Sequence, residues 1–231
     1  NMKMPLAIMR SDGSLMSEEM AREYPVETLL SGPAASLVGG SALAGQANAV
    51  IVDMGGTTTD VAMVRDKIPL TSQGGIKIGP WKTTINGVYV DTFLLGGDSA
   101  VRFREGSLYL DGRRVIPLSF LAGRYPQVRE KLAALGRQKR THTRMLHEFY
   151  VLQRSIAGQP GFTEEEQALC RALEQGPLPI EELAEAVKGD IYTMKTERLE
   201  AEGILMRSGL TPTDAMILKG DFTGHSGEAA G

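Results

Sequence analysis

Residues 49–64 constrain the fold of this chain more than any other stretch. They comprise an apolar run, the carboxylate of Asp53, two glycines, three threonines, a second carboxylate at Asp60 and another apolar run. Apolar runs on either side of a glycine-rich segment predict two strands, at residues 49–53 and 60–64, joined by a tight turn. Such a turn can gather backbone N–H groups and hydroxyls around a phosphate group.

Each residue type in this turn suits that chemistry. Glycines lack a Cβ, so their N–H groups can approach an anion closely, and threonines add hydroxyl donors. The candidate phosphate-binding residues are Gly55, Gly56, Thr57, Thr58 and Thr59. Asp53 and Asp60 offer oxygen ligands for Mg²⁺, which would bridge phosphate oxygens. The turn alone leaves open the alternative of an ordinary hairpin rich in glycine and threonine.

The sequence on either side of the turn predicts further elements. A helix of small residues begins near Pro33, with Ser31 or Gly32 as its cap, and runs to Ala44. Residues 107–118 are typical of a hairpin that turns at Asp111–Gly112.

The later part of the chain has a different character. Residues 126–157 are basic and have helical propensity. Helices at 163–175, 179–187 and 191–202 and a strand at 203–207 follow, in the order found in a winged helix.

Several motifs together resemble the hydantoinase/oxoprolinase family (N-methylhydantoinase A type), within the actin-like ATPase superfamily. The matching segments are Met9-Arg10-Ser11-Asp12-Gly13, Ser31-Gly32-Pro33-Ala34-Ala35, Asp53-Met54-Gly55-Gly56-Thr57-Thr58-Thr59-Asp60, Gly79-Pro80-Trp81 and Gly209-Leu210-Thr211-Pro212-Thr213-Asp214-Ala215. They stand in the family's order. The resemblance implies an α/β fold: a partial ribonuclease H-like lobe with a mixed sheet, followed by a helical, winged-helix-like segment.

The resemblance also implies an activity. Members of the family open cyclic amides such as hydantoins or 5-oxoproline, using ATP to phosphorylate the ring oxygen so that water can attack the amide carbon. By this resemblance, residues 55–59 line the phosphates of ATP, while Asp53 and Asp60 hold Mg²⁺ or manage the attacking group. Gly96 and Gly97 stand where relatives often have a longer glycine run, so they are either ligand contacts or a plain turn.

The sequence lacks two features that the family usually has. No earlier Asp-x-Gly-Gly-Thr turn precedes residue 53, and the segments that would complete an adenosine pocket are missing. The chain therefore resembles a middle portion of such an enzyme, completed by another lobe of the parent protein or by a partner subunit. We expect it to bind nucleotide weakly or not at all when alone.

A second hypothesis is a non-catalytic actin-like scaffold or regulator that contacts a protein through the winged-helix-like segment. Contact with DNA is less favoured, because the third predicted helix is net negative and would repel phosphates. The basic stretch at 129–144 keeps that possibility open. These predictions divide the chain into an ATPase lobe (1–122), a helical winged-helix-like segment (123–207) and a segment returning toward the lobe (208–231).

The composition argues against several other classes of protein and site. The net charge of −3 argues against a general nucleic-acid binder, and the polar residues within uncharged residues 28–52 argue against a membrane span. A single cysteine, Cys170, excludes an internal disulfide and suits the cytoplasm. We expect Cys170 to be buried, Trp81 to serve as a packing anchor, and the histidines (His142, His147 and His225) to bind no metal. The oligomeric state is left open.

Overall fold

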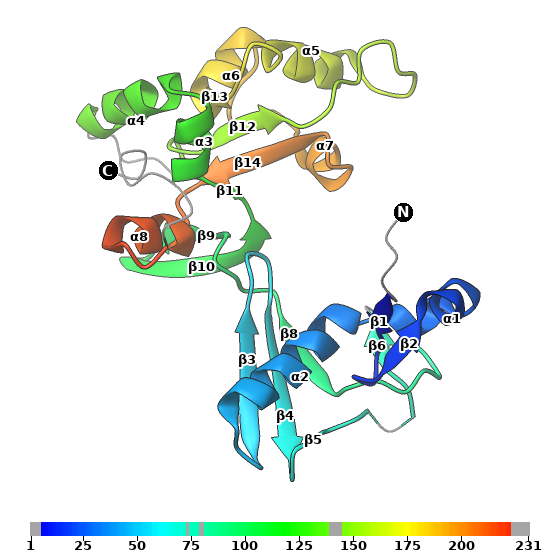
Figure 1. Ribbon diagram of the computed structural model, residues 1–231. Helices are drawn as coiled ribbons and strands as arrows, with labels where there is room; N and C mark the ends of the chain where they lie inside the picture. Colours follow the sequence, from blue (N-terminus) through cyan, green and yellow to red (C-terminus); the bar gives the residue numbers. More distant parts are fainter. Residues whose placement is uncertain (1–5, 73, 79–80, 139–144, 223–231) are drawn as a thin grey trace. The chain divides into compact units, whose positions relative to one another are not determined.

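The computed structural model describes residues 6–72, 74–78, 81–138 and 145–222 (Figure 1). It separates into two compact units, Asn1–Leu95 and Gly96–Gly231. The predicted α/β class is confirmed, because both units combine helices with sheets. Within the described residues, no helix is both long and apolar enough to cross a membrane.

The first unit is built around short strands and one long helix. Its elements are β1 (Ala7–Met9), β2 (Leu15–Ser17), α1 (Glu18–Glu23), the 3-10 helix η1 (Pro25–Thr28), α2 (Ser31–Ala44), β3 (Ala49–Met54), β4 (Thr59–Arg65), β5 (Ile68–Pro69), β6 (Lys77–Ile78), β7 (Trp81–Lys82) and β8 (Val90–Phe93). The predicted helix at 33–44 and the two predicted strands are confirmed to within two residues.

Strand β4 lies at the centre of the main sheet of this unit. It pairs with β3 on one side and with β5 and β8 on the other. All strand pairings among the described residues of this unit are antiparallel, so the mixed sheet predicted for this lobe is not found here. Short connections such as residues 55–58 permit only antiparallel pairing, because parallel strands need a long crossover.

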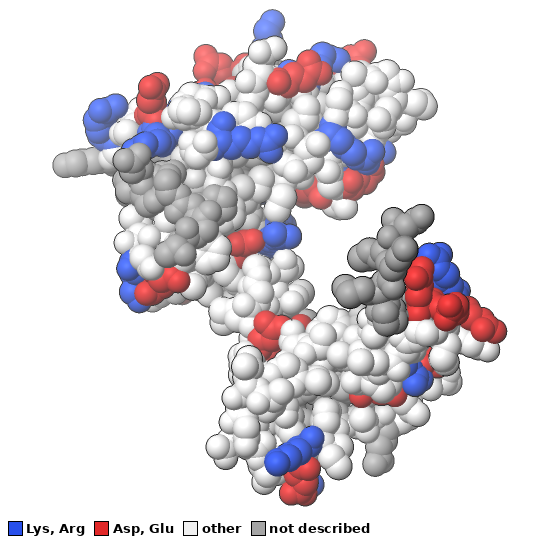
Figure 2. Space-filling model, in the orientation of Figure 1, with Lys and Arg blue, Asp and Glu red and all other residues white. Residues whose placement is uncertain are grey.

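Helix α2 packs on one face of that sheet. Its Ala34 and Leu37 are buried with Ala62 and Val64 of β4. A Cβ at Gly40 would lie only 2.9 Å from the Ile51 Cγ2 atom, so the missing side chain allows α2 to approach β3 closely. Figure 2 shows that the surface over α2 is largely uncharged.

The start of α2 differs from the prediction. The residue before the helix, Leu30, has a left-handed conformation (φ 59°) and makes no side-chain capping bond. Ser31 and Gly32 are already helical, so neither is the cap. Pro33 is therefore the third helical residue, where it still has no carbonyl of the same helix to bond to.

The second unit has a sheet at its centre. Its elements are β9 (Ser99–Arg104), β10 (Ser107–Arg114), β11 (Ile116–Pro117), α3 (Leu118–Arg124), α4 (Gln127–Arg137), β12 (Phe149–Leu152), α5 (Glu164–Ala172), β13 (Leu178–Pro179), α6 (Ile180–Ala186), α7 (Glu197–Ala201), β14 (Leu205–Gly209) and α8 (Pro212–Lys219). The sheet has the order β11-β14-β12-β13, with β11 and β14 parallel and the other pairs antiparallel, so the mixed sheet of the protein is here.

Strands β9 and β10 form a hairpin whose turn was predicted wrongly. The chain turns at Glu105–Gly106, with φ angles of 52° and 80°, and not at Asp111–Gly112. Positive φ at both central residues matches the twist of paired strands, which explains the tight connection. Asp111 lies within β10, where the register shifts between Leu110 and Arg114.

The helical region also differs from its prediction. Strand β12 replaces the end of the helix expected over 126–157, because its Phe149, Tyr150 and Val151 are buried in the sheet. The helix expected at 191–202 is shortened to α7. After α7, β14 pairs with β12 and β11, which both precede α5, and the described residues after β14 contain no further strand that could complete a wing.

The division between the units falls earlier than the predicted boundary between residues 122 and 123. Residues after 95 join the second unit because they contact the end of the chain: Ile116 pairs with Ser208, and the Val101 N–H donates to the Leu210 carbonyl oxygen at 2.7 Å. The segment after residue 208 thus lies in the same unit as residues 96–122.

Candidate functional site

The predicted phosphate turn is the hairpin of β3 and β4 in the first unit. Asp53 lies directly opposite Asp60 in the antiparallel register. Opposed residues on such strands point to the same face, with Cβ atoms about 5 Å apart. The face is the one on which α2 packs, since Ile51 and Ala62, two residues further along each strand, contact that helix. Figure 1 shows α2 crossing the part of the hairpin away from its turn.

A hydroxyl group from β8 lies beside the two carboxylates. Thr92 pairs with Asp60 across the sheet, and its hydroxyl donates to the Asp60 Oδ1 atom at 2.7 Å. Asp53, Asp60 and Thr92 therefore form a row of oxygen atoms across three strands. Sequence reasoning missed Thr92, because the register between β4 and β8 joins residues 32 positions apart.

The turn itself closes through one backbone bond. The Gly55 N–H donates to the Thr58 carbonyl oxygen at 2.9 Å. Neither Gly55 nor Gly56 has a positive φ angle. A Cβ at Gly55 would be 3.7 Å from the Thr58 carbonyl oxygen, which is ordinary van der Waals contact. Folding of the turn therefore does not require glycine at position 55, and its absent side chain leaves the backbone of the turn uncovered.

The three threonines of the turn have different surroundings. Thr57 is exposed and Thr58 is half-buried, so both lie at the surface of the turn. Thr59 is buried, and its hydroxyl donates to the Leu95 carbonyl oxygen at 2.7 Å. This hydrogen bond thus anchors the segment that follows β8.

The carboxylates supply a donor set that fits Mg²⁺. Asp53 is exposed and Asp60 is half-buried, and a small hard cation prefers such oxygen ligands while retaining several waters. The described residues contain no group of three or more histidine, cysteine or acidic side chains placed to hold a metal. Any cation held by Asp53 and Asp60 would need further oxygen ligands besides these two carboxylates.

Gly96 and Gly97 belong to the second unit, and the structure gives them local partners. The Gly96 N–H donates to the Ser99 hydroxyl at 2.9 Å, and the Gly97 carbonyl oxygen accepts from the Thr213 N–H at 2.9 Å. Asp98 accepts from the Thr213 hydroxyl and from Arg114. These contacts favour a turn fixed to α8, which is the second of the two interpretations the sequence left open.

The segment at 209–215 contains a residue whose role the sequence analysis missed. Asp214 is buried, and its carboxylate accepts from the Thr211 N–H and hydroxyl and from the N–H groups of Leu118 and Ser119, at 2.8–3.2 Å. It thereby completes the capping box of α8 and also caps α3. The pattern Thr-Pro-Thr-Asp is a capping-box signal that could have identified the first role.

Among the remaining candidate residues, one prediction is confirmed and one is wrong. Cys170 is buried in the helical core, as predicted, and this burial raises the pKa of its thiol. Trp81 was predicted wrongly as a packing anchor, because it is 75% exposed. Burial, followed by the charge of Arg102, lowers the pKa of His147. His142, His225, Gly79–Pro80 and the end of the basic stretch at 139–144 lie outside the described residues.

Comparisons with known proteins bear on the first half of the chain. The hydantoinase/oxoprolinase family model matches residues 1–124. No curated protein matches the chain. A solved structure of nucleotide-free acetone carboxylase, from work on the mechanism of ATP-dependent acetone carboxylation, shares 23% identity and a TM-score of 0.41. That likeness covers 48% of this chain and 16% of the acetone carboxylase chain.

The matched region contains the whole β3–β4 hairpin and helix α2. It also contains the segments Met9–Gly13 and Ser31–Ala35 that carried the resemblance. Since the family model spans more than half of the chain, the protein belongs to the hydantoinase/oxoprolinase family.

Proposed function

We propose that this chain is part of an ATP-dependent hydrolase that opens cyclic amides of the hydantoin or 5-oxoproline type. The observation that supports this most directly is the hairpin that pairs Asp53 with Asp60 beside an uncovered glycine-threonine turn. In this proposal the first unit is a portion of an actin-like ATPase lobe. Magnesium-ATP would supply the phosphoryl group that activates the ring amide toward water.

The residues of the chain have separate tasks in this proposal. Asp53 and Asp60 bind the magnesium ion, and Thr92 orients the Asp60 carboxylate through its 2.7 Å hydrogen bond. The backbone N–H of Gly56 and the hydroxyls of Thr57 and Thr58 contact phosphate oxygens, while Gly55, whose N–H donates to the Thr58 carbonyl oxygen, leaves room for the phosphate to approach. The lobe that completes the nucleotide site comes from elsewhere in the parent protein or from a partner subunit.

The test is turnover by the natural gene product that carries these residues, with hydantoin and 5-oxoproline as substrates. We expect ring opening that requires both ATP and Mg²⁺, and a loss of roughly 100-fold or more in the Asp53→Asn variant. Ring opening without ATP, or full activity in Asp53→Asn, would contradict the proposal. An Asp91→Asn variant is the control, because Asp91 lies opposite Val61 on the other face of the same sheet.

The alternative, a non-catalytic scaffold that uses a winged-helix-like segment, is favoured by one observation. The elements α5, β13, α6, α7 and β14 follow one another in the order of a winged helix and share one apolar core, although β14 pairs with the earlier strands β11 and β12. Binding of a protein partner to the gene product, with no ATP turnover toward any cyclic amide, would support this alternative over the enzyme.

A further inference from the structure

The second unit contains a cavity that the proposed function does not use. It has a volume of about 550 Å³ and lies between the end of β10, helix α7 and strand β14. A cavity of this size can hold a small organic ligand. Arg113 and Arg114 come from β10, Arg207 from β14, and Glu197 and Glu200 from α7.

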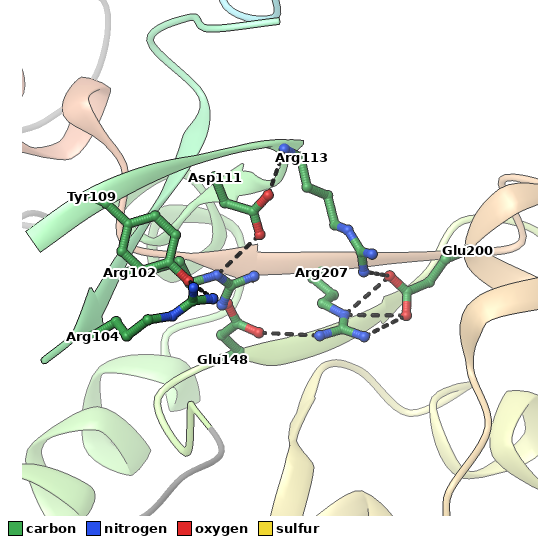
Figure 3. Close-up of polar contacts among 8 residues, drawn as sticks. All are labelled: Arg102, Arg104, Tyr109, Asp111, Arg113, Glu148, Glu200 and Arg207. Atoms are coloured by element: carbon green, nitrogen blue, oxygen red, sulfur yellow. Dashed lines mark hydrogen bonds and ion pairs between the residues drawn. The ribbon is translucent and has the colours of Figure 1, made fainter.

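One side of this cavity is fixed by a partly buried ion-pair network (Figure 3). Arg207 donates to both carboxylate oxygens of Glu200 at 2.8–3.1 Å, lies 3.5 Å from Glu148 and stacks on the Tyr150 ring at 5.1 Å. Glu148 also pairs with Arg102. Because its partners use most of its donors, Arg207 forms the wall of the cavity and is not its main ligand-binding group.

Arg113 and Arg114 have a different environment. Their side chains are 50% and 53% exposed. Arg113 donates to Glu200 at 3.1 Å, and Arg114 donates to one oxygen of Asp98 at 3.2–3.3 Å. A guanidinium group has five N–H donors in a planar fork, so both residues keep donors for an anionic group.

The remaining lining is mostly apolar. Ala201 is exposed and Met206 is half-buried, and both line the cavity, while the buried core residue Leu205 lies behind them. Gln153 adds an amide at the edge. Two exposed guanidinium groups beside apolar side chains match a molecule that has one anionic group and an apolar body.

We propose that this cavity binds a small organic anion, with its carboxylate or phosphate group on Arg113 and Arg114 and its apolar body against Ala201 and Met206. Glu197 limits the affinity, because its charge also acts on Arg207 and would repel the ligand. This site is independent of the β3–β4 hairpin, since every residue involved lies in the second unit.

Isothermal titration of the 231-residue chain tests this proposal with benzoate, phenyl phosphate and uncharged benzamide as probes. We expect one or both anions to bind more tightly than benzamide, and comparison of the two shows which anionic group is preferred. The Arg113→Gln and Arg114→Gln variants should each weaken binding roughly tenfold, the effect of one charge-assisted hydrogen bond. Glu197→Gln should strengthen it a few-fold.

Arg104→Gln is the matched control, because Arg104 is an exposed arginine of the same hairpin that stacks on Tyr109 and does not line the cavity (Figure 3). Its affinity should equal that of the wild type. The proposal is overturned if no anion binds up to about 10 mM, if benzamide binds as tightly as both anions, or if Arg113→Gln and Arg114→Gln bind like Arg104→Gln.

Discussion

At the residue scale, we expect the glycine at position 55 to matter for ligand binding and not for folding. Its φ angle is not positive, and a Cβ there meets only ordinary contact with Thr58. We expect Gly55→Ala to change the free energy of unfolding by less than about 0.5 kcal/mol. The added methyl group would instead cover the backbone that approaches phosphate, so magnesium-ATP affinity of the natural gene product should fall roughly tenfold or more.

Chemical denaturation and calorimetry check the two halves of this prediction. Gly13→Ala is the comparison for folding, because Gly13 has a φ of 85° and its Cβ would lie 3.1 Å from the Val38 Cγ2 atom. It should lower stability. A strongly destabilised Gly55→Ala protein would show that the turn needs glycine for folding.

Asp214 is predicted to be the carboxylate on which the second unit most depends. Its replacement by alanine leaves the N–H groups of Leu118, Ser119 and Thr211 without their acceptor. We expect a loss of roughly 3 kcal/mol or more in the free energy of unfolding, measured by urea denaturation. Asp221→Asn is the control, because Asp221 makes one exposed ion pair with Lys219, and its loss should cost about 0.5 kcal/mol or less. Similar losses in both variants would contradict this role.

The half-buried His147 predicts a pH dependence of stability. Burial lowers its pKa in the folded state, so the unfolded state takes up a proton first as the pH falls. The stability contribution is therefore complete above the unfolded pKa of about 6.5 and is lost as the pH falls below it toward the folded pKa. Melting temperatures measured between pH 8 and pH 5 (roughly the range where histidine titrates) should fall less steeply in His147→Gln than in the wild type. Parallel curves would contradict the assignment.

At the element scale, the two adjacent glycines of α2 have opposite roles. A Cβ at Gly39 meets nothing within 4 Å, whereas one at Gly40 would lie 2.9 Å from Ile51. Gly39→Ala should raise the free energy of unfolding by roughly 0.5–1 kcal/mol, because alanine favours helix. In Gly40→Ala the contact with Ile51 should cancel or reverse that gain. Thermal denaturation of the pair measures the difference, and equal stabilisation would show that α2 does not pack closely on β3.

The elements that the sequence predicted well carry strong local signals. Helix α2 and strands β3 and β4 are set by small-residue composition and by apolar runs around the Gly55–Gly56 turn. The β9–β10 turn was missed because Asp111–Gly112 is the stronger local turn signal, while Glu105–Gly106 is selected by the pairing of the two strands. Strand β12 was missed although Phe149–Leu152 is an aromatic and β-branched run typical of strands.

At the scale of the whole molecule, the features that the sequence did not predict depend on contacts between distant positions in the chain. The division at residue 95 follows from β11 pairing with β14, about 90 positions later, and no local pattern encodes such a pairing. The same holds for the candidate site: the hairpin and its turn were predicted from residue types and spacing, but the contact of Thr92 with Asp60 and the separate surroundings of Gly96 and Gly97 depend on long-range pairing. The family match over residues 1–124 places the hairpin inside the segment shared with hydantoinases and oxoprolinases.

Above all, we propose that the Asp53–Asp60 hairpin binds magnesium-ATP. The most direct measurement of this binding is calorimetric titration of the natural gene product with ATP, with and without Mg²⁺, for the wild type, Asp53→Asn and the Asp91→Asn control. We expect magnesium-dependent binding that Asp53→Asn weakens roughly 100-fold or more and that Asp91→Asn leaves unchanged. Magnesium-independent binding, or equal affinities in all three proteins, would contradict it.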